Sequence, residues 1–118
     1  MKPTRGYYSL IQFCPDASRL ETINVGVVLF CPDTGFLAAR MAAGNQRAEK
    51  IVERGTLDKA ALNSAKRAIE RRLEVDRDAF QSLDDLQRFV ATRGNTLKLT
   101  DPRPLKVFDP QQDLDSLF

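Results

Sequence analysis

The fold is decided between Tyr7 and Arg40. The sequence there reads Tyr-Tyr-Ser-Leu-Ile-Gln-Phe-Cys-Pro-Asp, a short polar connection, and then Asn-Val-Gly-Val-Val-Leu-Phe-Cys-Pro-Asp-Thr-Gly-Phe-Leu-Ala-Ala-Arg. Aromatic and β-branched residues dominate this stretch and favour strands. Two segments end in the same tetrapeptide, Phe-Cys-Pro-Asp, and its proline lacks the amide hydrogen that would continue a sheet ladder. The stretch therefore predicts three successive strands, at about Tyr7 to Cys14, Asn24 to Cys31 and Phe36 to Met41.

The first two predicted strands should be antiparallel neighbours. Only residues 15 to 23 connect them, whereas a parallel crossover needs a dozen or more residues. Cys14 and Cys31 then lie at opposite ends of the hairpin, roughly 20 Å apart at about 3.3 Å per residue. A disulfide requires Cα atoms within about 7 Å, so we expect two free, structural cysteines. The second strand is almost continuously apolar, which predicts a central strand that is covered on both faces.

Composition excludes several classes of function. The chain of 118 residues suits a single domain over residues 1–118, and its net charge of +2 gives no strong attraction to nucleic acid or to a membrane. It contains no histidine, which excludes Ser-His-Asp and Cys-His catalysis and histidine-dependent metal sites. It also lacks a phosphate-binding glycine motif, so we expect no cofactor. Because it has neither a signal peptide nor an apolar run of about 18 residues, we expect a cytoplasmic protein.

After the three strands the pattern changes mainly to helical spacing. Apolar residues recur every three or four positions, and glycine, aspartate and serine stand where helices would begin or end. The pattern predicts helices over Asn45–Arg54, Asp58–Glu74 and Ser82–Gly94, strands over Thr96–Thr100 and Leu105–Phe108, and a last helix from Asp109. The fold class is therefore α+β. We expect a small, mostly antiparallel sheet, made of an N-terminal three-strand meander and a later strand pair, packed with three to four helices.

Several strings in this chain resemble those of one known family. They are Tyr7-Tyr8-Ser9-Leu10, Cys14-Pro15-Asp16, Arg19-x-Glu21-x-x-Asn24-Val25-Gly26-Val27, Leu29-Phe30, Leu97-Lys98-Leu99-Thr100-Asp101-Pro102-Arg103-Pro104 and the closing Asp113-Leu114-Asp115-Ser116-Leu117-Phe118. They resemble DUF3037, a bacterial family of domains of unknown function, over nearly the whole chain. The resemblance implies no assigned chemistry. It implies a neighbour, because such proteins are often encoded beside a HipA-like kinase-fold protein, and a family sequence that extends a few residues beyond the final Leu-Phe.

Arg19, Glu21 and Asn24 are the candidate binding residues. A guanidinium, a carboxylate and an amide where a loop meets a strand could hold a ligand or a group of a partner protein. Alternatively, Arg19 pairs with Glu21 and Asn24 caps the loop, so that the three residues only brace it. We favour bracing, because short loops must satisfy their own hydrogen bonds. Gly26, within the strand that follows, can mark a bulge or a close approach by another backbone, and we favour packing as its reason.

A basic cluster lies on the longest predicted helix and just beyond it: Lys66, Arg67, Arg71, Arg72 and Arg77. Such residues could follow the phosphates of nucleic acid. However, acidic residues are interleaved three and four positions away, which is typical of a solvated, salt-bridged surface. We therefore expect no nucleic-acid partner, and we expect Lys66→Ala to change the free energy of unfolding by less than about 0.5 kcal/mol.

The last predicted helix carries Leu114, Leu117 and Phe118 on one face. These residues dock either on the protein's own core or on a partner, and the proline-flanked edges beside them could accept a strand from another chain. Two functional hypotheses follow. The first is a non-catalytic protein-interaction or accessory subunit, with the HipA-like kinase-fold protein as partner. The alternative is a small histidine-independent enzyme or ligand-binding regulator that uses the Arg19, Glu21 and Asn24 loop.

Overall fold

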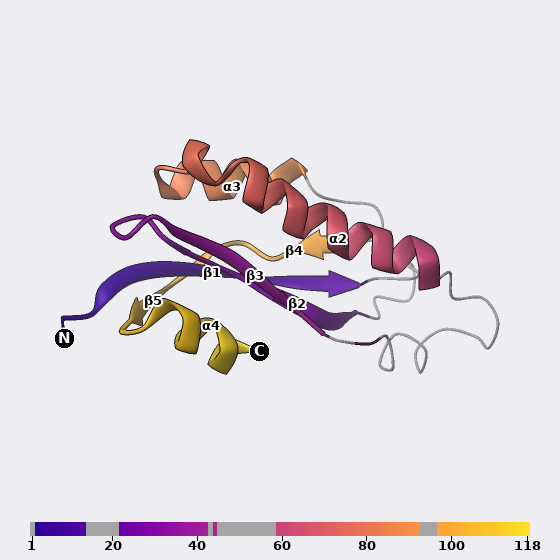
Figure 1. Ribbon diagram of the computed structural model, residues 1–118, viewed down its shortest axis with the longest axis horizontal. Helices are drawn as coiled ribbons and strands as arrows, with labels where there is room; N and C mark the ends of the chain where they lie inside the picture. The colour runs from indigo at the N-terminus through magenta and orange to yellow at the C-terminus, as the bar shows by residue number, and fades with distance from the viewer. Residues whose placement is uncertain (1, 14–21, 43, 45–58, 93–96) are drawn as a thin grey trace.

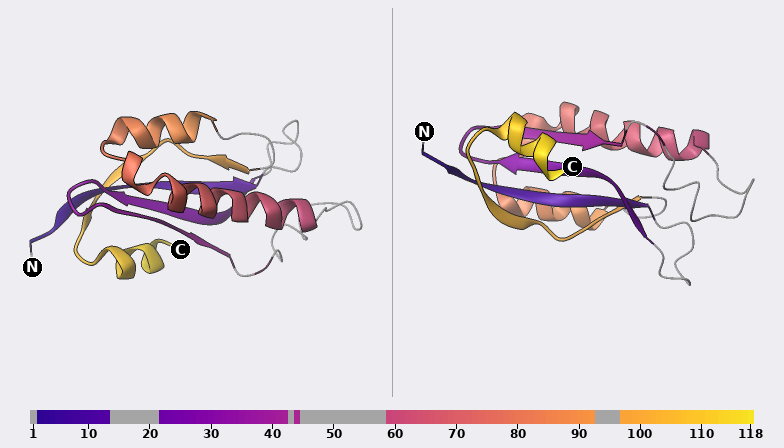
Figure 2. Two further views of the ribbon diagram at one scale, coloured as in Figure 1. Left: turned by 45° about the horizontal axis from the view of Figure 1, so that its top comes forward. Right: turned by 90° about the horizontal axis from the view of Figure 1, so that it is seen from below.

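An antiparallel sheet forms the middle layer of the protein, and helices pack on both of its faces (Figure 1). The computed structural model describes residues 2–13, 22–42, 44, 59–92 and 97–118. Helices α2 (Lys59–Val75) and α3 (Leu83–Thr92) lie on one face of the sheet, whereas α4 (Pro110–Leu117) lies on the other (Figure 2). This arrangement confirms the α+β class.

The first three strands form the predicted meander. They are β1 (Thr4–Phe13), β2 (Ile23–Cys31) and β3 (Phe36–Met41), and each pairs antiparallel with the next. The last seven residues of β2 are all buried, which confirms a central strand covered on both faces. Gly35, with a φ of 71°, makes the turn from β2 to β3 in a backbone conformation that glycine adopts at little cost.

The β1–β2 ladder contains a bulge next to Gly26. Ile11 lies opposite Gly26 but Gln12 lies opposite Asn24, so β2 has one extra residue at this point. A Cβ atom on Gly26 would lie only 2.8 Å from the backbone oxygen of Arg40 on β3. The bulge and the close backbone approach that a glycine within a strand can mark are therefore both present at Gly26.

The two later strands are present, but they do not pair with each other as predicted. Both β4 (Leu97–Leu99) and β5 (Arg103–Val107) pair antiparallel with β1, β4 near its C-terminal end and β5 near its N-terminal end. Because both are antiparallel to the same strand, they run in one direction along its outer edge and cannot form a hairpin. β1 has ten residues and spans about 33 Å, which is long enough for both partners.

Thr100, which follows β4, forms hydrogen bonds with Ser9 and Leu10 of β1. Its backbone oxygen accepts a hydrogen bond from Ser9 Oγ at 2.6 Å, and its Oγ1 accepts one from the Leu10 amide at 2.9 Å. Its own amide donates to the Leu10 oxygen at 3.0 Å. Ser9 is fully buried, so these bonds satisfy a hydroxyl that would otherwise be costly to bury.

The sheet separates two hydrophobic cores. The larger core lies under α2 and α3 and contains Ile11, Phe13, Val25, Val28, Phe30, Leu37, Leu62, Ile69, Leu73, Leu86, Phe89, Val90 and Leu97. The smaller core lies under α4 and contains Val27, Leu29, Cys31, Val107 and Leu114. Leu114 is 2% exposed. This burial confirms that the last helix docks on the protein's own core.

The helix boundaries follow local sequence signals. α2 begins and ends within one residue of its predicted range, and a short 3-10 helix, η2 (Arg77–Ala79), follows it. At the start of α3 the Asp85 carboxylate accepts hydrogen bonds from the backbone amides of Gln81 and Ser82. The predicted helix Asn45–Arg54 lies outside the described residues. None of the described helices is both long and apolar enough to span a membrane.

Candidate functional site

Of the three predicted binding residues, the structure describes only Asn24. Its side chain is exposed near the start of β2, and its Oδ1 accepts a hydrogen bond from Gln12 Nε2 at 3.0 Å. The two side chains lie opposite each other in the β1–β2 ladder. Arg19 and Glu21 lie outside the described residues, so a ligand site formed by the three residues remains a prediction.

Lys66 corrects the prediction of a solvated basic surface. Its side chain is 5% exposed, and its Nζ donates hydrogen bonds to the backbone oxygens of Ala42 at 3.3 Å and of Gly44 at 3.2 Å. Burial lowers the pKa of Lys66, an effect that nearby Glu70 partly opposes. The aliphatic stem continues the buried stripe of α2 while the ammonium group reaches two carbonyls beyond β3. The buried side chain of Lys66 therefore links α2 to Ala42 and Gly44 by hydrogen bonds.

The remaining cluster is as exposed as predicted. Arg67, Arg71, Arg72 and Arg77 are all exposed, and Arg72 Nε lies 2.9 Å from Asp76 Oδ2 in an i,i+4 ion pair. Such exposed pairs are typical of a solvated helix surface.

Cys31 is a free, fully buried cysteine in the smaller core. Burial raises the pKa of its thiol, and the carboxylates of Asp113 and Asp33 raise it further, to about 11. The thiol therefore stays protonated near neutral pH and is a poor nucleophile. This confirms the structural interpretation for Cys31, whereas Cys14 lies outside the described residues. The described residues contain no group of three or more His, Cys, Asp or Glu side chains placed to hold a metal ion.

The two edges of the sheet differ in their protection against strand pairing. Proline and charged residues are the usual means by which sheet edges avoid pairing with other chains. The edge formed by β4 and β5 carries Pro104 and the exposed charged residues Lys98, Arg103 and Lys106. The opposite edge is β3, which begins Phe-Leu-Ala-Ala and contains neither proline nor a charge in those four residues. The first four residues of β3 therefore carry neither of these protective features.

Alternate backbone groups of β3 point away from the sheet. The amide of Ala42 donates to the oxygen of Val25 at 2.8 Å, which continues the β2–β3 register by one residue. In an antiparallel ladder, inward and outward bonding alternate along each strand. The amide and carbonyl groups of Leu37, Ala39 and Met41 consequently face outward. No strand in the described part of the chain pairs with this outer edge.

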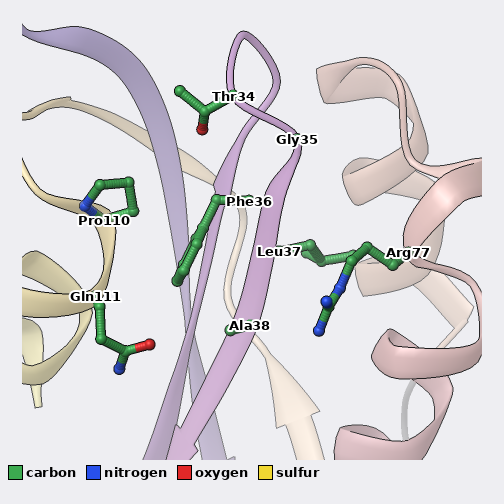
Figure 3. A pocket seen from close by; sticks show the side chains of 8 residues that line it. All are labelled: Thr34, Gly35, Phe36, Leu37, Ala38, Arg77, Pro110 and Gln111. Atoms are coloured by element: carbon green, nitrogen blue, oxygen red, sulfur yellow. The ribbon is translucent and has the colours of Figure 1, made fainter.

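A groove of about 450 Å³ follows the first half of this edge. Figure 3 shows β3 between its two walls: Arg77 of η2 reaches in from one side, and Pro110 and Gln111 of α4 lie on the other. Leu37 points toward Arg77, and Phe36 lies on the side of α4. The groove thus places an exposed backbone edge between one cationic wall and one largely apolar wall.

The only charged residue of β3, Arg40, is paired with the C-terminal helix. Arg40 Nη1 donates to Asp115 Oδ1 at 2.7 Å, and the Arg40 guanidinium carbon lies 5.6 Å from the centre of the Phe118 ring. In contrast, Arg77 has no carboxylate partner in the part of the chain that the structure describes. The site can therefore offer backbone hydrogen bonds, apolar contact and one available cation, which are the means of binding an extended peptide.

These features define a small α+β domain in which no described strand covers the β3 edge of the sheet. Comparison of the sequence with models of known protein families identifies the family of this domain. A family model described as "Protein of unknown function (DUF3037)" matches residues 8–118, and the chain belongs to that family. No curated protein and no solved structure matched the chain.

The accessible β3 edge was not predicted from the sequence, which places strand addition at the proline-flanked edges beside the last helix, although the signal for β3 is present. Phe36 to Ala39 lacks the prolines and charges that mark Lys98 to Lys106. The contrast becomes visible only when both segments are known to be sheet edges. Arg77 enters the site because η2 directs it toward β3, and its position two residues after the end of α2 does not reveal this.

Proposed function

We propose that this protein is a non-catalytic interaction module that binds a partner by accepting one of its strands at the outer edge of β3. The observation that carries the proposal is the outward-facing backbone of Leu37 and Ala39, on a β3 edge that no described strand covers and whose first half lines a groove. Added strands gain affinity from main-chain hydrogen bonds and specificity from alternate side chains. The buried and protonated Cys31 and the lack of histidine argue against catalysis at this surface.

A candidate for the partner protein follows from the family resemblance. The resemblance to DUF3037 proteins suggests the HipA-like kinase-fold protein encoded beside them as the first partner to test. In this proposal the kinase-fold protein supplies the added strand, and the present chain acts as its accessory subunit.

The test uses the alternation of β3. Ala39→Pro removes an amide hydrogen that faces outward, so the β2–β3 ladder is kept and prolines are tolerated at such edge positions. Ala38→Pro removes an inward-facing amide and should destabilise the sheet. We expect Ala39→Pro to fold yet to lose co-purification with the kinase-fold protein, whereas Lys98→Ala on the opposite edge should retain it. Undiminished binding by a folded Ala39→Pro variant would contradict strand addition at β3.

A further inference from the structure

We infer that the strand accepted at β3 alternates acidic and apolar side chains, with its acids on the side of Arg77 and its apolar residues on the side of α4. This inference rests on the proposed function and specifies its partner. Successive side chains of any added strand point to opposite faces of the sheet. One set therefore continues the row of Leu37 and Ala39, and the other set continues the row of Phe36 and Ala38.

The first set meets a cation. Arg77 lies in the same wall as Leu37, is exposed, and has no carboxylate partner among the described residues. A guanidinium presents several donors in a planar fork that fits a carboxylate. A glutamate or aspartate beside Leu37 would pair with it, whereas a lysine or arginine there would be repelled. Arg77 therefore selects an acidic residue on this face of the added strand.

The second set meets an apolar wall. Phe36 and Ala38 on β3 and Pro110 at the start of α4 line this side of the groove, and Gln111 stands at its rim. A valine or similar side chain on this face of the added strand would therefore lie beside apolar residues. Covering Phe36, which is only partly buried, would remove apolar surface from water.

A second copy of this chain does not match these two walls. Pairing β3 with β3 would bring Phe-Leu-Ala-Ala-Arg-Met into the groove, a segment with no carboxylate for Arg77. Its single charge, Arg40, belongs to the row of Phe36 and Ala38 on the side of α4, so it supplies no carboxylate to Arg77 either. Charge complementarity therefore favours a different, acidic chain over self-association.

The test compares three capped peptides: Ser-Val-Glu-Val-Glu-Val-Ser, the same peptide with threonine in place of glutamate, and the same peptide with lysine. Binding is followed by the NMR shifts of the Leu37 and Ala39 amides at low salt. We expect the glutamate peptide to bind about fivefold more tightly than the threonine peptide, the size of a single exposed ion pair. The lysine peptide should bind most weakly. Arg77→Gln should remove the preference for glutamate, and the matched control Arg103→Gln on β5 should retain it.

The outcomes separate this inference from the proposed function. If all three peptides shift Leu37 and Ala39 equally, strand addition stands and the acidic preference is wrong. A preference that persists in Arg77→Gln would likewise overturn the role of Arg77. If no peptide shifts these amides, both the inference and the proposed strand addition are overturned. A dimer that sediments as such and is lost in Ala39→Pro would show that the chain pairs with itself, which also overturns the acidic partner.

Discussion

The ammonium nitrogen of Lys66 lies 3.2 Å from the backbone oxygen of Gly44 and donates a hydrogen bond to it. It also donates to Ala42, so one side chain of α2 binds two carbonyls just beyond β3. Burying a charged amine is costly unless it is hydrogen-bonded. These bonds compensate for the burial and hold the end of β3 against α2.

We expect Lys66→Ala to be destabilising. The variant loses charge-assisted hydrogen bonds, each worth about 1.5–3 kcal/mol, and leaves two carbonyls to find other partners. The matched control is Arg67→Ala, the exposed neighbour, which should change the free energy of unfolding by less than about 0.5 kcal/mol. Urea denaturation of both variants measures the difference. Equal stability of the two would show that the buried ammonium contributes nothing to folding.

Cys31 should make stability depend on pH in the alkaline range. Folding raises the pKa of its thiol from 9.0 to about 11, so the unfolded chain releases this proton first. The contribution is complete below about pH 9 and is lost as the pH rises toward 11. As the pH rises from about 9 to about 11, Cys31→Ala should therefore lose less stability than the parent protein does. Urea denaturation across this range tests it, and identical pH profiles for the two proteins would contradict the shift.

Much of the sheet could be predicted because its signals are local. The apolar runs, the two prolines after them and the short connection fix three antiparallel strands without reference to the rest of the chain. The placement of β4 and β5 could not be predicted in this way. A three-residue strand has little sequence pattern of its own, and its register depends on distant bonds such as those of Thr100 with Ser9 and Leu10.

Lys66 shows why a helix surface is difficult to predict from charge alone. Its position, four residues after Leu62 and three before Ile69, lies on the buried stripe. Its charge and its arginine neighbours, however, predict a surface position. A long lysine stem can nevertheless follow an apolar stripe to a distant acceptor. The acceptors, Ala42 and Gly44, are more than twenty residues away in the sequence, so no local pattern reveals them.

The predicted binding residues can be tested through Arg19 and Glu21, together with Asn24 near the start of β2. If these residues only brace the loop, Arg19→Ala and Glu21→Ala should each lower stability by about 1 kcal/mol or less, and the double variant should cost little more. Asn24→Ala, which removes the acceptor of the Gln12 hydrogen bond, is the reference variant, because the contact that it loses is seen in the structure and is also exposed. Thermal denaturation and partner co-purification are measured together. Variants that stay fully stable yet lose a bound partner would make this loop the binding surface in place of the β3 edge.

The C-terminal helix should be held mainly by its buried leucine. Leu114 is 2% exposed in the smaller core, and replacing a buried leucine by alanine costs about 2–5 kcal/mol. The Arg40–Asp115 pair is about half exposed on both sides, and such pairs contribute about 1 kcal/mol or less. We therefore expect Leu114→Ala to reduce the free energy of unfolding several times more than Arg40→Ala does. Urea denaturation ranks the variants.

The matched control is the double variant Arg40→Ala with Asp115→Ala. Because each residue is the other's partner, removing both should cost little more than removing one. Phe118→Ala should also have a small effect, since half of that side chain is exposed. The opposite ranking, with Arg40→Ala more harmful than Leu114→Ala, would mean that polar contacts hold α4 on the sheet. In that case the packing of α4, whose Pro110 lines the β3 groove, would weaken as the salt concentration rises. Added salt should then weaken peptide binding even in the Arg77→Gln variant.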